Sequence, residues 1–149
     1  MAADVPLTFA QLAAQFSSNI QGVDVDRFGN VYVADANNAR IRKIDVQRNV
    51  TTVAGTGTAG DDDNAGAIRE VRYLAVDDSD SVYVSSPSGK VRVFRNGQLY
   101  TVLVAGLYSG DGFAKVFQFI PRHMAVNKRT GRLFTGQGGQ VFALDALVP

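Results

Sequence analysis

Short stretches of alternating apolar and polar residues recur along the chain, and turns rich in Gly, Asp and Asn separate them. In "VDVDRFGNVYVAD" (23–35), two short runs carry apolar residues at every second position, which is typical of half-buried strands. The segment "DRFGN" between these runs has the composition of a hairpin turn. The pattern therefore predicts two antiparallel strands rather than a helix.

The same pattern returns twice along the chain. Residues 23–35 align with "LAVDDSDSVYVSS" (74–86) and with "MAVNKRTGRLFTG" (124–136). Val31 aligns with Val82 at an offset of 51 residues, and the next step has the same offset. A strand-rich unit repeated about every 40–50 residues indicates the blades of a propeller.

Two further strands complete the predicted unit. The third strand covers residues 40–44, 90–94 and 140–144, and the fourth covers "TTVAG" (51–55) and "VLVAG" (102–106). The Asn-Gly pair in "RNGQ" is a strong hairpin signal between the third and fourth strands of the second unit. We therefore predict an all-β fold, a β-propeller of three four-stranded antiparallel blades. An ordinary β-sandwich whose strands resemble one another by coincidence is the alternative.

The first unit resembles a known family of propellers. "GVDVDRFGNVYVADANNARIRKID", followed by "VTTVAGTGTAG", is similar to the NHL repeat, whose blades carry the motif Asp-x-x-Asn-x-Arg-Ile. The resemblance thins in the second unit, where "SSPSGKVRVF" keeps Arg92, and the motif is lost in the third unit. The three units cover about residues 10–144. The resemblance implies a propeller, and six is the usual number of NHL blades.

Length and composition are compatible with one domain. A chain of 149 residues, 46% of them apolar, can bury one core. We assign residues 10–55 to blade 1 with a preceding loop, 56–106 to blade 2 and 107–149 to blade 3. The segment 9–16 is the one amphipathic helix candidate.

Charge and cysteine content exclude several classes of function. The net charge of +1 gives no reason, from composition alone, to expect a polyanionic partner. The chain has no cysteine, which excludes disulfides, thiolate metal sites and a cysteine nucleophile. The N-terminal residues lack the features of a secretory signal, and no apolar run is long enough to span a membrane. If this N-terminus is native, we expect a soluble, intracellular protein.

Three blades are too few to close a ring, because closed propellers have about four to eight. An open arc would also leave unpaired strand edges, which favour aggregation. We favour a homodimer in which two three-bladed halves form a six-bladed ring, since twofold dimers are the commonest oligomers. Residues 5–9 ("VPLTF") could supply the outer strand that blade 3 lacks. The alternatives are a fragment of a longer propeller and a half that docks on a different protein.

Strand order places two groups of loops at one end of the predicted propeller, the top face. One group joins the second and third strands, at residues 35–38, 86–89 and 136–139. The other group joins consecutive blades, at residues 56–66 and 107–115. Loops over a rigid scaffold are where binding residues concentrate, so we predict the binding site on this face.

The alignment brings candidate binding residues together where the innermost strands begin. "VRYLAV" and "PRHMAV" place Arg72 at the position of Arg122, and Tyr73 at the position of His123. In a dimer, four arginines and two histidines would surround the top of the central channel as an anion-binding funnel. Alternatively, these arginines pair with aspartates of the long loops or stay hydrated.

Other polar clusters have a structural interpretation. Asp35, Asn38 and Arg40 belong to the NHL-like motif, in which the Asn fixes a turn and the Arg can bridge to the Asp, so we expect them to brace the blade. The acidic runs at residues 61–64 and 77–80 could bind calcium through oxygen ligands. Neither has the spacing of an EF-hand loop, and we favour solvated turns.

The sequence favours a binding module over an enzyme. Propellers that resemble this one include metal-dependent lactonases and lyases, but a single histidine per chain and the interblade position of Glu70 argue against their metal sites. We expect no cofactor and no metal, and a protein or peptide ligand on the top face. RNA is the alternative ligand, because some NHL propellers bind RNA, although few aromatic residues occur in the predicted loops.

Overall fold

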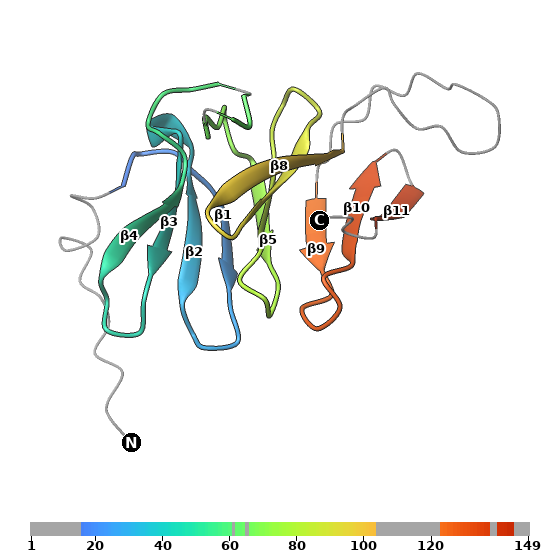
Figure 1. The fold of residues 1–149 in the computed structure, drawn as a ribbon, viewed down its shortest axis with the longest axis horizontal. Helices are drawn as coiled ribbons and strands as arrows, with labels where there is room; N and C mark the ends of the chain where they lie inside the picture. Colours follow the sequence, from blue (N-terminus) through green and yellow to red (C-terminus); the bar gives the residue numbers. More distant parts are fainter. Residues whose placement is uncertain (1–15, 61, 65, 104–122, 138–139, 145–149) are drawn as a thin grey trace.

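In a computed structural model of the chain, residues 16–60, 62–64, 66–103, 123–137 and 140–144 are described. They form three antiparallel sheets that lie side by side in chain order (Figure 1). Blade 1 comprises β1 (Ile20–Val25), β2 (Val31–Asp35), β3 (Arg40–Ile44) and β4 (Val50–Ala54). Blade 2 comprises β5 (Tyr73–Val76), β6 (Val82–Ser85), β7 (Val91–Arg95) and β8 (Gln98–Leu103). Blade 3 comprises β9 (His123–Val126), β10 (Leu133–Gln137) and β11 (Gln140–Leu144).

The predicted all-β propeller fold is confirmed, since each strand pairs with the next along the chain in all three blades. The helical part of the described chain is a single turn of 3-10 helix, η1 (Ala36–Asn38), between β2 and β3. The helix candidate at 9–16, apart from its last residue, and the strand candidate at 5–9 lie outside the described residues. Within the described part of the chain, no helix is both long and apolar enough to cross a membrane.

The fourth strand of blade 2 starts earlier than the repeat predicts. It covers Gln98–Leu103, whereas the alignment suggested 102–106. The reason is the two-residue turn at Asn96 and Gly97, whose φ values of 51° and 80° suit a tight hairpin. Arg95 then pairs directly with Gln98, so β8 begins at once. In blade 1 the corresponding turn is longer, and it is closed by a hydrogen bond from Asp45 N to Asn49 O.

The turns between the first and second strands of each blade share one internal brace. Asp26 Oδ1 accepts hydrogen bonds from the backbone N–H of Phe28 (2.8 Å) and Asn30 (2.9 Å). In blade 2, Asp77 Oδ1 accepts in the same way, from two serine N–H groups. In blade 3, Asn127 Oδ1 accepts from Thr130 N at 3.1 Å. A side chain that mimics a backbone turn in this way fixes the hairpin, which explains why Asp and Asn recur at this position.

The hydrophobic core lies between the blades. Between blades 1 and 2 it contains Tyr32, Ala34, Ile41, Ala54, Leu74, Val76, Val82, Val84 and Leu99, with Ile68 and Val71 from the interblade segment. Between blades 2 and 3 it contains Tyr83, Val91, Val93 and Leu133, against which Tyr100, Val102, Met124 and Val126 pack. Both faces of blade 2 are therefore buried, and a rigid scaffold supports the loops at either end.

Candidate functional site

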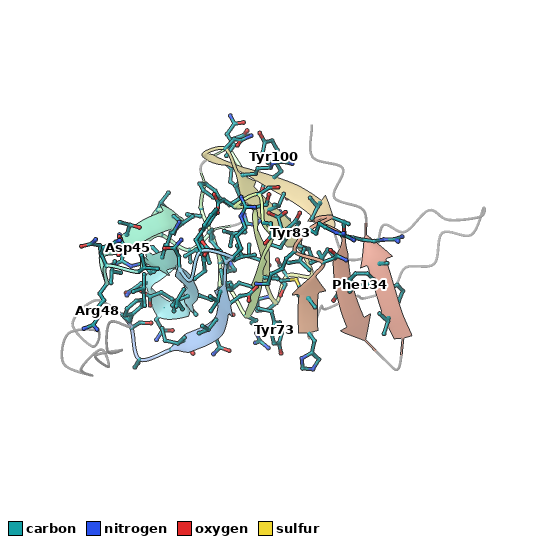
Figure 2. The ribbon with its side chains drawn as sticks, turned by 90° about the horizontal axis from the view of Figure 1, so that it is seen from below. Asp45, Arg48, Tyr73, Tyr83, Tyr100 and Phe134 are labelled. Carbon is teal, nitrogen blue, oxygen red and sulfur yellow. The ribbon has the colours of Figure 1, made fainter. Side chains whose placement is uncertain are left out.

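Two rings from neighbouring inner strands meet at the top face. Tyr73 is the first residue of β5 and His123 the first residue of β9. Their ring centroids lie 5.6 Å apart with a tilt of 47°. Figure 2 shows Tyr73 and Tyr100 on opposite sides of blade 2, with Tyr83 between them. The ring pair therefore sits on the inner side of the arc, where a propeller has the mouth of its central channel.

Arg72 precedes Tyr73 and is exposed. Its backbone N–H donates to Ser85 O at 3.0 Å, which extends the pairing of β5 with β6 by one residue. The position of the backbone is thus fixed while the guanidinium stays accessible. Arg122, the predicted counterpart, lies outside the described residues, so the funnel of arginines stays a prediction.

Blade 1 contributes amides rather than rings to the same edge. Asn19 Nδ2 donates to Asn37 Oδ1 at 3.1 Å, and Gln21 Nε2 donates to Asn19 Oδ1. Gly22 stands at the position of Tyr73, and a Cβ there would lie only 3.1 Å from the backbone nitrogen of Leu74. Because contacts this short are rare, a glycine lets β1 approach β5 closely at the top of the channel.

The predicted structural triad is placed at the same end of blade 1. Asp35 is fully buried, and its carboxylate accepts hydrogen bonds from Ser17 N and Asn38 Nδ2, both at 2.9 Å. Burial by itself would raise the pKa of Asp35, but these hydrogen bonds and the positive charge of Arg42 lower it below its usual value. The guanidinium group of Arg40 lies beside Gly57. A Cβ added to Gly57 would be 2.6 Å from one of the guanidinium nitrogens.

A buried arginine, Arg92, anchors the interblade segment. The sequence indicates it only as the part of the NHL-like motif that the second unit keeps. Arg92 is 1% exposed, and its Nη1 donates to Ala67 O at 2.9 Å and lies 3.3 Å from Asp63 Oδ1. Thr101 Oγ1 donates to the other oxygen of Asp63 at 2.6 Å. The sequence offered one sign that Arg92 is buried: it stands between two valines of β7, and both valines are buried.

Two further acidic residues of the runs considered for calcium, Asp62 and Asp77, are also engaged within the protein. Asp62 Oδ1 accepts from Asn64 N at 2.9 Å, and Tyr83 OH donates to Asp77 Oδ2 at 3.1 Å. Among the residues that the structure describes, no three His, Cys, Asp or Glu side chains cluster as metal ligands. Glu70 is exposed in the interblade segment, shortly before β5, with a φ of 37°.

A cleft of about 850 Å³ opens on the outer side of blades 1 and 2. Strands β4 and β8 form its walls, and Asp63, Asn64 and Gly66 of the interblade segment close one end. Its lining mixes threonines and amides with the rings of Phe94 and Tyr100. The cleft lies between the outermost strands, on the opposite side of the arc from the Tyr73–His123 pair.

Comparison with known proteins identifies the fold and not the family. No protein-family model and no curated protein matches the sequence. A protein of unknown function from Bacteroides thetaiotaomicron superposes with a TM-score of 0.55 at 18% identity, covering 77% of this chain and 32% of that one. PorZ, a surface component of the type-IX secretion system of Porphyromonas gingivalis, gives 0.50 at 12% identity, covering 85% and 17%.

Virginiamycin B lyase from Staphylococcus aureus gives a TM-score of 0.47 at 13% identity, covering 87% of this chain and 42% of the lyase. The chain thus spans less than half the length of each of these proteins. At such identities the likeness concerns the fold alone. The three sheets described above, together with the likeness at TM-scores of 0.50 and above, place the chain among the β-propellers.

Proposed function

We propose that this chain is a non-catalytic recognition module that binds a protein or peptide ligand on its top face. The observation that carries the proposal is the contact between the rings of Tyr73 and His123, with the exposed Arg72 beside them. These side chains begin strands of a rigid scaffold, so little order has to be gained when a ligand binds. Aromatic rings and arginine are also the residue types that contribute most at protein interfaces.

The amides of blade 1 suit the same kind of ligand. Asn19, Gln21 and Asn37 present donors and acceptors at the beginning of β1 and the end of β2. A peptide backbone offers matching groups, and an acidic side chain or a terminal carboxylate would pair with Arg72. In this proposal the blades are of the NHL type, and two chains assemble into a ring.

The proposal is tested by selecting peptides from a displayed library on the wild-type protein and measuring the affinity of the best peptide by calorimetry. We expect Arg72→Ala, Tyr73→Ala and His123→Ala each to weaken binding by about tenfold or more, since Arg and Tyr often form hot spots and the ring of His123 contacts that of Tyr73. Arg129→Ala is the matched control, because Arg129 is exposed on the turn at the opposite end of blade 3. Equal losses for Arg129 and Arg72 would contradict the assignment.

RNA is the second candidate ligand, and the same ring pair favours it, because unpaired bases stack on aromatic side chains next to arginine. A gel shift with single-stranded RNA at two salt concentrations separates the candidates. Salt-dependent binding that is lost in Arg72→Ala, with no peptide selected, would replace the peptide proposal. Stoichiometric zinc or calcium in the purified protein would instead favour an enzyme of the metal-dependent kind.

A further inference from the structure

Equivalent apolar residues of blades 1 and 2 differ sharply in exposure. Val23 of β1 is 58% exposed, whereas Leu74, its equivalent in β5, is 6% exposed. Val25 is 42% exposed, whereas its equivalent Val76 is fully buried. All four residues are branched aliphatic, so the difference in exposure lies in what covers them.

Blade 1 covers the residues of blade 2. Leu74, Val76, Val82 and Val84 share one face of blade 2, because they stand directly opposite one another in β5 and β6. This face, which we call the leading face, packs on Tyr32, Ala34 and Ile41 of blade 1. The equivalent leading face of blade 1 consists of Val23, Val25, Val31 and Val33. Blade 2 packs on the other side of blade 1. On the leading face of blade 1, Val23 and Val25 are accessible, whereas Val33 is 6% exposed.

In blade 3, in the part of the chain that the structure describes, it is the other face of the sheet that has no blade packed on it. In blade 2, the face turned towards blade 3 includes Tyr83, Val91 and Val93, and all three are buried. We call this the trailing face. In blade 3 the equivalent residues, by strand pairing, are Phe134, Val141 and Ala143. Val141 is 79% exposed where Val91 is fully buried.

Within the residues that the structure describes, the same contact from leading face to trailing face occurs twice, and one leading face and one trailing face have no blade packed on them. Figure 1 shows blades 1 and 3 at opposite ends of the row, with blade 2 between them. The two free faces of one copy are separated by blade 2, so they cannot cover each other within that copy.

We infer that a second copy of this chain covers both faces. The leading face of blade 1 in one copy packs on the trailing face of blade 3 in the other, and a twofold axis produces the same contact again. Two identical seams then close a ring of six blades, and no further copy can add to it. This inference rests on the ring assembly of the proposed function and specifies the residues that form its seams.

The chemistry of the two faces supports this choice of partner. Val23 and Val25 are branched aliphatic residues like Leu74 and Val76, which already pack on a trailing face inside the chain. Val141 and Phe134 replace a valine and a tyrosine that already receive a leading face. A partner that fits both ends must carry a leading and a trailing face of the same kind, and this chain carries both.

The test is the mass of the protein in solution, measured by sedimentation equilibrium. We expect the wild type at micromolar concentration to have twice the monomer mass. Val23→Asp combined with Val25→Asp, and separately Val141→Asp, should weaken association about 100-fold or more, because each places charges in a buried seam. Val46→Asp is the matched control: Val46 is 59% exposed but lies on the turn after β3, outside both faces, and its dimer should persist.

Mixing the two damaged variants distinguishes this arrangement from other dimers. Each variant alone has two damaged seams, but a mixed pair has one intact seam, so mixing should restore association partly. A dimer that joins two leading faces would not be restored. A monomeric wild type, an equal effect of Val46→Asp, or no restoration on mixing would each overturn the inference.

The outcome is separable from that of the proposed function. If the protein is a monomer that still binds peptide through Arg72, the ring assembly is wrong and the recognition site is retained. A stable dimer that binds no peptide would keep the seams and remove the ligand proposal. Circular dichroism of each variant shows whether the fold is retained, and substitution at exposed positions should leave it so.

Discussion

Arg42 of blade 1 and Arg92 of blade 2 occupy equivalent positions but have different surroundings. Arg42 stands opposite Val33 and Thr52 in its sheet, and Arg92 stands opposite Val84 and Thr101. Arg42 is partly exposed, and its Nη1 donates to Thr52 Oγ1 at 2.5 Å. Arg92 is buried beneath the segment that joins blades 1 and 2.

The two arginines also face carboxylates of different origin. In blade 1 the nearby carboxylate is Asp35, at the end of the adjoining strand β2. Blade 2 has Ser86 at that position, and the carboxylate of Asp63 comes instead from the interblade segment. The same arginine position thus braces one blade internally in the first case and connects two blades in the second.

This difference shows that a repeat position has no fixed role. The strand supplies a cation on the leading face, and the partner is whichever carboxylate the fold brings there. Where a preceding segment covers the face, the cation becomes a buried anchor for that segment. Where the face is open, it remains a surface residue with a local partner.

The largest expected effect is a difference in the free energy of unfolding between the variants of the two arginines. Arg92→Ala should cost about 3 kcal/mol, the lower end of the range for breaking a buried ion pair, because Asp63 keeps access to water. Arg42→Ala should cost less than about 1 kcal/mol, as for exposed pairs. Urea unfolding of both variants measures the comparison, and similar losses for the two would show that the interblade segment is not anchored by Arg92.

Replacing Asp35 makes blade 1 resemble blade 2 and should have the next largest effect. Asp35→Ser should lower the free energy of unfolding by about 2 kcal/mol at neutral pH, because the partly buried donors of Ser17 and Asn38 lose their acceptor. The pKa of Asp35 is lowered in the folded state, so its charge contributes stability above its unfolded pKa of about 3.9. That contribution is lost as the pH falls through the lower folded pKa.

Unfolding of Asp35→Ser and of the wild type at neutral pH and at about pH 3 tests this reasoning. The difference in stability between the two proteins should shrink in acid. Asp62→Ser is the control, since Asp62 is exposed and its substitution should change little at either pH. A difference that stays constant with pH would mean that the charge of Asp35 contributes nothing.

The smallest expected effect concerns the second contact between blades, where a neutral hydroxyl makes the connection. Tyr83 OH lies 3.2 Å from Gly131 O of blade 3 and 3.1 Å from Asp77 Oδ2. Tyr83→Phe should therefore cost about 1 kcal/mol. Tyr32→Phe, at the equivalent position of blade 1, should cost less, because the neighbour of that hydroxyl is the side chain of the partly exposed Lys43.

Alkaline pH sharpens this last prediction. Burial, with the carboxylate of Asp77 nearby, raises the pKa of Tyr83 to about 12. The stability that depends on its protonated hydroxyl is fully present below the unfolded pKa of about 10 and is lost as the pH rises through about 12. Tyr83→Phe should lose less stability than the wild type between these values, as thermal unfolding would show. An identical alkaline loss in both proteins would contradict the assignment.

The strands and their grouping into blades could be predicted from the sequence, because both follow from local alternation and from the repeat. The same alignment brought Tyr73 and His123 to equivalent positions, and the structure shows their rings in contact. The partner of Arg92 could not be predicted, since Asp63 reaches it through a segment with no regular pattern. The exposure of Val23 was equally hidden, because it depends on the neighbouring blade and not on the strand itself.

Lys128 lies on the turn after β9, at the bottom of blade 3, yet its ammonium group reaches Asp24 of blade 1 at 3.1 Å and also the carbonyl of Val25. Its backbone carbonyl accepts from Asp78 N of blade 2 at 2.8 Å. An exposed pair of this kind adds little stability, under about 1 kcal/mol. Geometrically, however, it is a chord across an arc. It links blades 1 and 3 directly, in addition to their packing through blade 2, and so opposes straightening of the arc. One lysine thus bears on how strongly the three blades curve.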